Sequence, residues 1–399
     1  MATVKEATSP ILSVRKIRYL IFLKDVIVLA CTAFGGPQVH LAMYLDRLVH
    51  KRGYLTEDEL MELTALCQIL PGPTSTQTIT AIGFKIGGPN LAYLTLLVWI
   101  APAVLIMTVA GIGISHLPNL NFARFVQPMA VAFVAFAGFK ISKGLMRNRL
   151  DIVLMLFAMI ASYFFRSPWA CPLILLVGGS LTAFNYREHK QVPKAPMRIK
   201  WANFILFLSV AFGSAILGAL THSQPVLLFE NFYRNGSLIF GGGQALTPLL
   251  FNEFVHFKHY LSSEEFLSGL ALAQIVPGPV FSFTAYIGTL TMRDDGISGQ
   301  LWGSLMSTAG IFLPGTFLIF FVIRFWEQLK RYRVVRASLE GIKATNTGLV
   351  ASAAILLFEP MATDGISALI VMATFGLLQF TKIPQPFIIL VGLLAGFVI

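Results

Sequence analysis

The sequence predicts an all-α protein that crosses a membrane several times. Of its 399 residues, 56% are hydrophobic and only 12% are charged, whereas a soluble domain carries about 25% charged residues. The mean hydropathy is +0.73. The apolar stretches do not alternate apolar with polar residues, so we expect them to be helices rather than strands. We therefore expect the chain to lie in a lipid bilayer.

The apolar stretches are the candidate membrane spans. Most of them approach the roughly 20 residues that cross the hydrocarbon of a bilayer as a helix. They cover residues 90–114, 124–139, 151–165, 169–185, 201–221, 299–323, 338–357, 363–380 and 383–399. The start of the chain is polar and basic, and it lacks an apolar core followed by a small-residue cleavage site. We therefore expect no cleaved signal peptide.

The composition argues against several other classes of protein. The net charge of +11 comes from basic residues in short loops between the spans, which is an orientation signal of membrane proteins rather than a nucleic-acid surface. Cys31, Cys67 and Cys171 are widely spaced inside apolar segments, and they indicate neither a disulfide framework nor a metal site. We expect no cofactor, no metal and no nucleic-acid partner.

An internal repeat divides the chain. A shift of 206 residues aligns the motif Phe-Gly-Gly at 34–36 with 240–242, and the motif Pro-Gly-Pro at 71–73 with 277–279, without a gap. Over these 40 positions, 16 residues are identical. Farther along, "RDDGIS" is interpreted as a six-residue insertion, after which Pro102 aligns with Pro314 at a shift of 212. The chain is therefore predicted to hold two homologous halves.

The repeat predicts four segments. Residues 1–17 are a cytoplasmic N-terminal segment, and residues 18–185 are the first repeat. Residues 186–223 combine a basic cytoplasmic linker with one extra membrane helix, and residues 224–399 are the second repeat. Because a single helix lies between the repeats, the second repeat would enter the membrane from the opposite side.

Loop charges favour this opposed orientation. The N-terminus and the linker at 186–200 are rich in Lys and Arg, which places both in the cytoplasm. Residues 140–149 hold four basic residues, whereas their counterparts at 352–361 hold none. This complementary pattern predicts inverted-topology repeats.

The two Pro-Gly-Pro motifs interrupt apolar helices. Proline lacks the backbone N–H and prevents helix continuation, so we expect half-helices at 57–70 and 74–88, and again at 263–276 and 280–292. Irregular backbone at membrane depth persists only where protein or a water-filled cavity covers it. A single motif would suggest a packing kink, but its recurrence in opposed halves favours a site.

The breaks would expose the amino ends of the second half-helices. Free N–H groups at Thr74, Ser75 and Thr76, together with the positive end of the helix dipole, favour an anion. The glycine-rich turns offer backbone that can approach a ligand closely. Two facing helix ends supply about one positive charge, so a dianion would need another cation.

The predicted substrate-binding residues come from both motifs of both halves and from nearby ionisable side chains. They are Gly35, Gly36, Pro37, Gln38, His40, Arg47, Gln68, Pro71, Gly72, Pro73, Thr74, Ser75, Thr76, Gln77, Lys85, Gly241, Gly242, Gly243, Gln244, Gln274, Pro277, Gly278, Pro279 and Ser282. Arg47 and Lys85 could instead mark the cytoplasmic edge, and His40 could be a structural group or a proton relay.

These motifs carry a resemblance to a known family. "FGGPQVH", "YLTEDEL" and "ALCQILPGPTSTQ" resemble the first-half signature of the chromate ion transporter family. "FGGGQALTPLL" and "LALAQIVPGPVFSFTAYIG" resemble its second-half signature. The chain is similar to the long, two-domain form over nearly its whole length. One departure is Gln244, which stands where the family often has a histidine. Unlike a histidine, the glutamine side chain cannot carry charge.

The resemblance implies a secondary transporter that exports chromate across the cytoplasmic membrane of a bacterium and confers chromate resistance. Sulfate is the implied competing or exchanged oxyanion, as in an antiporter, and a homodimer is left open. Rocking of one half against the other would give alternating access. An Arg47→Ala variant is then expected to lose export while it stays folded.

Alternatives from other classes stay open at this point. One is a proton-coupled transporter of another anion or small solute, which would share the architecture. The others are a non-transporting membrane sensor and an intramembrane enzyme. An enzyme would need a nucleophile with its base, or a metal cluster, and neither pattern occurs at membrane depth in the sequence. No catalytic residue is therefore assigned.

Overall fold

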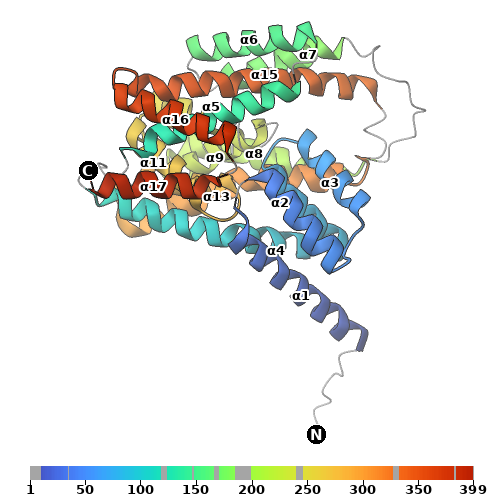
Figure 1. The fold of residues 1–399 in the computed structure, drawn as a ribbon. Coiled ribbons are helices and arrows are strands. Elements are labelled where there is room, and N and C mark those ends of the chain that lie inside the picture. The colour runs from blue at the N-terminus through green and yellow to red at the C-terminus, as the bar shows by residue number, and fades with distance from the viewer. Residues whose placement is uncertain are drawn as a thin grey trace.

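The computed structural model describes most of the chain, namely residues 10–34, 36–117, 124–145, 148–165, 170–184, 199–239, 246–326, 332–381 and 383–398. Within these ranges the chain is almost wholly helical and contains no strand, which confirms the all-α prediction for them. Figure 1 shows the helices packed into one body, from which the N-terminal part of α1 projects.

The first repeat contains helices that overlap its four predicted apolar stretches and further helices that precede them. They are α1 (Pro10–Thr32), α2 (Pro37–Tyr44), a π-helix (Leu45–Lys51), α3 (Glu57–Ile69), α4 (Thr74–Ser115), α5 (Val126–Leu145), α6 (Arg149–Phe164) and α7 (Ala170–Ala183). The long helix α4 bends at Gly88, whose φ of 75° lies in the left-handed region that glycine tolerates.

The extra helix and the second repeat follow. They are α8 (Ala202–Thr221), α9 (Gln224–Leu238), α10 (Leu246–Phe251), a π-helix (Asn252–Phe257), α11 (Ser263–Ile275), α12 (Phe283–Thr291), α13 (Gly296–Val322), α15 (Arg333–Phe358), α16 (Gly365–Phe380) and α17 (Gln385–Val398). Short 3-10 turns cover Val280–Ser282, Arg293–Asp295 and Glu359–Met361. A π-helix therefore follows α2 in the first repeat and α10 in the second.

The helices that lead into the two Pro-Gly-Pro motifs start with the same local chemistry. The Thr56 hydroxyl accepts from the Glu59 N–H, and the Glu59 carboxylate accepts from the Thr56 N–H. Ser262 and Glu265 repeat this capping box at the start of α11. Each box satisfies two backbone donors that a helix start leaves without partners.

The two repeats interleave rather than form separate bodies. Helix α15 of the second repeat packs along α5, α6 and α7 of the first, as Figure 1 shows. Small residues permit this approach: a Cβ atom at Gly341 of α15 would collide with the Gly178 carbonyl of α7. Close backbone contact of this kind is typical of helix pairs in membranes.

Helices α4 and α13 cross the centre of the body in opposite directions. Near one end, the Thr108 and Ser304 hydroxyl oxygens lie 2.6 Å apart. Toward the other end, the Tyr93 and Phe320 ring centroids are 5.2 Å apart. Residue numbers rise along α4 as they fall along α13, so the two helices are antiparallel.

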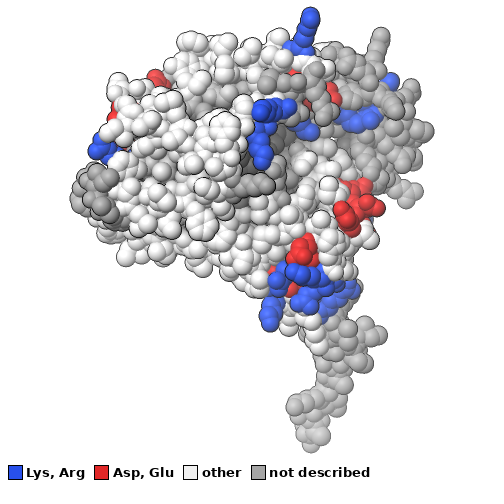
Figure 2. Space-filling model, in the orientation of Figure 1, with Lys and Arg blue, Asp and Glu red and all other residues white. Residues whose placement is uncertain are grey.

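The exterior is that of a multi-pass membrane protein. Among the described residues, four helices are long and apolar enough to cross a membrane: Thr74–Ser115, Ala202–Thr221, Arg293–Val322 and Arg333–Met361. Large apolar side chains such as Leu220 also lie exposed on the outside. Figure 2 shows charged side chains to be sparse over the visible face, which suits a surface in contact with lipid.

Candidate functional site

The first Pro-Gly-Pro motif separates two helices. Helix α3 ends at Ile69 and α4 begins at Thr74, and we call residues 70–73 the first break. Gly72 has a φ of 119°, which an L side chain rarely adopts. Its N–H donates to the Ile239 carbonyl of the second repeat, at 2.7 Å. The first break is therefore held by the other half of the chain.

The second motif has the equivalent geometry. Helix α11 ends at Ile275 and a helical turn resumes at Val280, so residues 276–279 form the second break. Gly278 has a φ of 110°, and its N–H donates to the Ala33 carbonyl, at 2.8 Å. Ala33 and Ile239 are equivalent at the shift of 206 residues, so the two hydrogen bonds are reciprocal.

Both breaks also pack against the central helices. A Cβ atom at Gly72 would lie 3.3 Å from the Cα of Gly315 on α13. A Cβ atom at Gly278 would lie 3.1 Å from the Cβ of Ala103 on α4. Ala103 and Gly315 are equivalent at the shift of 212 residues, just after Pro102 and Pro314. The breaks of the two repeats therefore meet α4 and α13 in the interior of the body.

A glutamine side chain completes the first break. Gln77 is 2% exposed, and its Nε2 donates to the Pro71 carbonyl at 2.7 Å and to the Gly315 carbonyl at 3.2 Å. The Pro71 carbonyl lies in the break, outside both helices, and the Gln77 amide supplies a donor for it. Gln77 thus joins the first break to α13.

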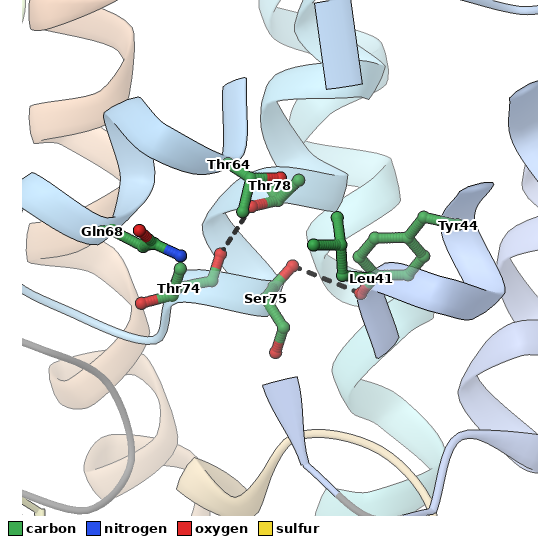
Figure 3. Close-up of a pocket in the computed structure, with 7 residues that line it drawn as sticks. All are labelled: Leu41, Tyr44, Thr64, Gln68, Thr74, Ser75 and Thr78. Carbon is green, nitrogen blue, oxygen red and sulfur yellow. Dashed lines mark hydrogen bonds between the residues drawn. The ribbon is translucent and has the colours of Figure 1, made fainter. Parts of the chain in front are cut away.

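A pocket lies at the amino end of α4, beside the first break. Its volume is about 70 Å³, and it is lined by Leu41, Tyr44, Thr64, Gln68, Thr74, Ser75 and Thr78. Figure 3 shows side chains from α2, α3 and α4 that surround this space, which we call the Ser75 pocket. Pro73, the residue that precedes α4, provides no side-chain cap for the first N–H groups of the helix. The positive end of the α4 dipole therefore adjoins the pocket.

Aromatic and imidazole groups position Ser75. The Tyr44 hydroxyl donates to the Ser75 carbonyl at 3.2 Å, a bond drawn in Figure 3. His40 Nδ1 lies 3.1 Å from Ser75 Oγ. Trp99 packs edge-on to His40, with ring centroids 5.3 Å apart, and its Nε1 donates to Thr76 Oγ1 at 3.1 Å. Three of the predicted residues, His40, Ser75 and Thr76, are thereby brought together.

Arg47 lies beside a buried carboxylate rather than among the pocket-lining residues. Its Nη2 is 2.8 Å from Oδ1 of Asp25, which is 1% exposed. Arg52 Nε is 2.8 Å from the other oxygen of the same carboxylate, and the Tyr54 hydroxyl donates to it at 3.2 Å. We call these four residues the Asp25 cluster. Figure 2 shows charged side chains of both signs gathered where α1 leaves the body.

Lys85 also has a carboxylate partner. Its ammonium group pairs with Glu59 at the start of α3, and both side chains are well exposed. In the second repeat, Arg293 pairs with Glu265, the residue equivalent to Glu59. Each repeat therefore ties the start of one half-helix to the end of the next.

The counterpart of the Ser75 pocket in the second repeat is filled with aromatic rings. Phe281 and Phe283 stand where the first repeat has Ser75 and Gln77, and they are 2% and 0% exposed. Between them, the Ser282 hydroxyl is buried without a hydrogen-bond partner among the described residues. The two breaks thus share a backbone but not their side-chain chemistry.

The remaining predicted residues divide into two groups. Pro277, Pro279 and Gln274 lie in or just before the second break, and Gly36 precedes α2 with a φ of 81°. The following predictions lie outside the described residues: Gly35, Gly241, Gly242, Gly243, Gln244 and the side chains of Pro37 and Gln38.

Sequence reasoning missed several residues that shape the site. Thr64 and Thr78 line the pocket four positions from the predicted residues Gln68 and Thr74, so helical periodicity could have found them. Asp25 is an acidic residue inside an apolar run, which by itself marks a functional hypothesis. Tyr44 and Trp99 carried no signal, because aromatic residues are common in membrane helices.

Comparison with known proteins gives a consistent answer. The chromate transporter family matches residues 21–183 and 226–397. The chain is 25% identical to an uncharacterised transporter of Methanocaldococcus jannaschii over 393 residues, 96% of this chain and 93% of that protein. It is 24% identical to the chromate transport protein of Cupriavidus metallidurans over 379 residues, 93% of this chain and 90% of that one.

A shorter relative covers less than half of the chain. An uncharacterised transporter of Bacillus subtilis is 29% identical over 180 residues, which are 94% of that protein but 43% of this chain. No solved structure matches the chain. Because the family match falls on both halves and takes up most of the sequence, the chain belongs to the chromate transporter family.

Proposed function

We propose that the chain is a secondary transporter that exports chromate, or a related tetrahedral oxyanion such as sulfate, with the Ser75 pocket as its binding site. The observation that carries this proposal is the lining of the pocket. Five of its seven residues bear hydroxyl groups and a sixth, Gln68, bears an amide, at the amino end of α4.

The chemistry of the pocket suits an oxyanion. The hydroxyls of Thr74 and Ser75 and the amide of Gln68 can donate hydrogen bonds to its oxygens. The other three hydroxyls of the lining donate to backbone carbonyls. No carboxylate lies among the lining residues to repel the anion. The helix end contributes about half a positive charge. A volume of about 70 Å³ holds a few water-sized atoms, which is the scale of an ion with four oxygens.

Alternating access is proposed to come from two inverted repeats. The reciprocal hydrogen bonds of Gly72 and Gly278 support a two-fold relation between the repeats. The antiparallel course of α4 and α13 supports the inversion, because these helices hold equivalent positions in their repeats. In this proposal the N-terminus and the linker at 186–200 face the cytoplasm, and the breaks lie near the bilayer midplane.

A flux assay tests the binding site. Proteoliposomes with an imposed pH gradient should move chromate, and sulfate and molybdate should compete. Ser75→Ala should reduce chromate flux by about tenfold or more, since a lost hydrogen bond to a charged ligand costs about 1.5 kcal/mol or more. Ser282→Ala is the matched control, because it removes a buried hydroxyl at the amino end of the equivalent helix. If chromate moves under none of the imposed gradients, the oxyanion proposal is excluded, and the transported substrate is another solute.

The direction of transport and the role of Arg47 need a second assay. Everted membrane vesicles should take up chromate if the protein exports it, and cells that express it should tolerate more chromate. Arg47→Ala should lose this uptake and still fold, because Arg52 and Tyr54 continue to hold Asp25. Unchanged uptake would remove Arg47 from the transport path.

A further inference from the structure

A doubly charged oxyanion in the Ser75 pocket needs a cation close by. The amino end of α4 supplies only about half a charge. Of the basic residues that the sequence offers nearby, Arg47 lies against Asp25 and Lys85 against Glu59. No Lys or Arg lines the pocket. Among the residues that the structure describes, His40 is a basic side chain in direct contact with a pocket-lining residue.

His40 is placed to act on the pocket. The side chain is 1% exposed, and Nδ1 lies 3.1 Å from the hydroxyl of Ser75, a pocket-lining residue. Nε2 has no hydrogen-bond partner among the described residues. The imidazole therefore contacts the pocket through Nδ1, and Nε2 is not engaged in a hydrogen bond with the described residues.

Within the described part of the chain, the groups recorded in contact with His40 carry no charge. From α4 it meets Ser75 and the Trp99 ring. From the segment after α1 it meets the backbone of Ala33. Tyr44, on the same helix one turn away, is the nearest titratable group on α2, and its own neighbour on α3 is the Cys67 thiol. A buried imidazolium here would lack a counter-ion, and such an isolated charge is costly.

We propose that His40 takes up one proton when a tetrahedral dianion enters the Ser75 pocket and releases it when the dianion leaves. This inference rests on the proposed function, whose site it deepens. The dianion supplies the counter-ion that the imidazolium lacks, and the imidazolium supplies the cation that the dianion needs. Each therefore strengthens the binding of the other by the same factor.

The hydrogen bonds in the site can follow this change. Protonated His40 donates from Nδ1 to Ser75 Oγ, and the Ser75 hydroxyl then points its own proton at the anion. The second N–H of the imidazolium, on Nε2, requires an acceptor, and the ring lies beside the backbone of Ala33. The Ala33 carbonyl accepts from the Gly278 N–H, so His40 lies next to a hydrogen bond that joins the two repeats.

The consequence is that one proton travels with the anion. A dianion and one proton together carry a single negative charge across the membrane, so an electrical potential drives this complex with half the force that it exerts on the free dianion. The chain is then an oxyanion–proton cotransporter. Proton and oxyanion move in the same direction.

Calorimetry of anion binding tests the proton directly. Sulfate is the probe, because it stays doubly charged near neutral pH whereas chromate can take up a proton itself. Binding heats are measured for detergent-purified protein in buffers of different ionisation enthalpy, which counts the protons taken up. We expect about one proton per sulfate for the wild type at a pH above the ordinary histidine value of about 6.5. His40→Gln should take up none, and His50→Gln, at an exposed position on the adjoining π-helix, should match the wild type.

A measurement on the wild type alone guards against a variant that fails to fold. Sulfate affinity should weaken by up to tenfold per pH unit between about pH 6 and about pH 8. Sulfate binding without proton uptake, or with the same affinity throughout that range, would overturn the role of His40 and leave the proposed function standing. If neither sulfate nor chromate binds or moves, the proposed function fails, and this inference falls with it.

Discussion

The two breaks of this protein share a backbone and differ in chemistry. Gly72 and Gly278 have nearly the same φ, 119° and 110°, and each donates to the other repeat. Beside the first break stand Ser75 and Gln77, and beside the second stand two phenylalanines. The break itself is therefore a structural device common to both repeats, whereas polar chemistry is built on one of them.

The ion pairs near the π-helices differ in a second way. In the first repeat the π-helix supplies the base, Arg47, and α1 supplies the acid, Asp25. In the second repeat the π-helix supplies the acid, Glu253, and α9 supplies the base, Arg234. Arg47 and Glu253 are equivalent positions, so the charges are reversed between the repeats.

The two clusters also differ in net charge and in burial. Asp25 is shared by two arginines whose side chains are 31% and 45% exposed. Glu253 and Glu230 balance Arg234 and Lys258, and the two basic side chains are each only 19% exposed. The first cluster is thus positive and open to water, which attracts anions. The second is neutral and enclosed.

Breaking the enclosed cluster should have the largest effect on stability. Glu253→Gln removes one of the carboxylates that pair with the largely buried Arg234. It also removes the ionised acceptor of the hydrogen bond from the Asn235 amide. We expect a loss of about 3 kcal/mol. Asp25→Asn should cost less, because its arginines are partly hydrated. Apparent melting temperatures in detergent would test this ranking, and a larger drop for Asp25→Asn would reverse it.

Changing the two break glycines should have similar effects in both repeats. Alanine at Gly72 or Gly278 forces a side chain into a positive φ, which costs about 1–3 kcal/mol. Gly113→Ala is the control, because Gly113 is helical and a Cβ atom there meets nothing within 4 Å. Thermal unfolding of all three variants gives the comparison. A loss confined to one break would show that the breaks are not equivalent in structure.

Removing one threonine hydroxyl from each repeat should affect transport in one repeat only. Thr78 lines the Ser75 pocket, and Thr284 is its buried equivalent in α12. Each hydroxyl donates to a carbonyl one turn back, at 2.9 Å. Thr78→Val should lower chromate flux by up to about fivefold, because the hydroxyl that it removes holds the Thr74 carbonyl at the pocket through a hydrogen bond of about 1 kcal/mol. Thr284→Val should leave the flux unchanged. Equal losses would place substrate at both breaks.

The smallest effect is expected at the exposed ion pair. Lys85 and Glu59 are 43% and 39% exposed, and such pairs contribute less than about 1 kcal/mol. Lys85→Gln should therefore change the melting temperature little. Unchanged chromate flux in the same variant would remove Lys85 from the predicted site residues, whereas a loss of flux would mean that the lysine leaves Glu59 to meet the substrate.

Much of the local structure could be predicted from the sequence. The expected half-helix at 57–70 corresponds to α3 at Glu57–Ile69, and that at 263–276 to α11 at Ser263–Ile275. Apolar length, proline chemistry and capping residues act over a few positions, so they can be recognised without a fold. The missed residues Tyr44 and Trp99 reach Ser75 and Thr76 across helices, and such contacts leave no local pattern.

By itself, the sequence determined that the chain is helical, apolar and built as a repeat, and it located both breaks. Only the tertiary structure decided which basic residues stay near the pocket. Arg47 and Lys85 lie against Asp25 and Glu59, residues 22 and 26 positions away in the chain, while His40 meets Ser75. The physical reason is that a charged side chain pairs with the group that tertiary packing places beside it. The spacing of residues within a motif does not predict how helices that are distant in the chain pack.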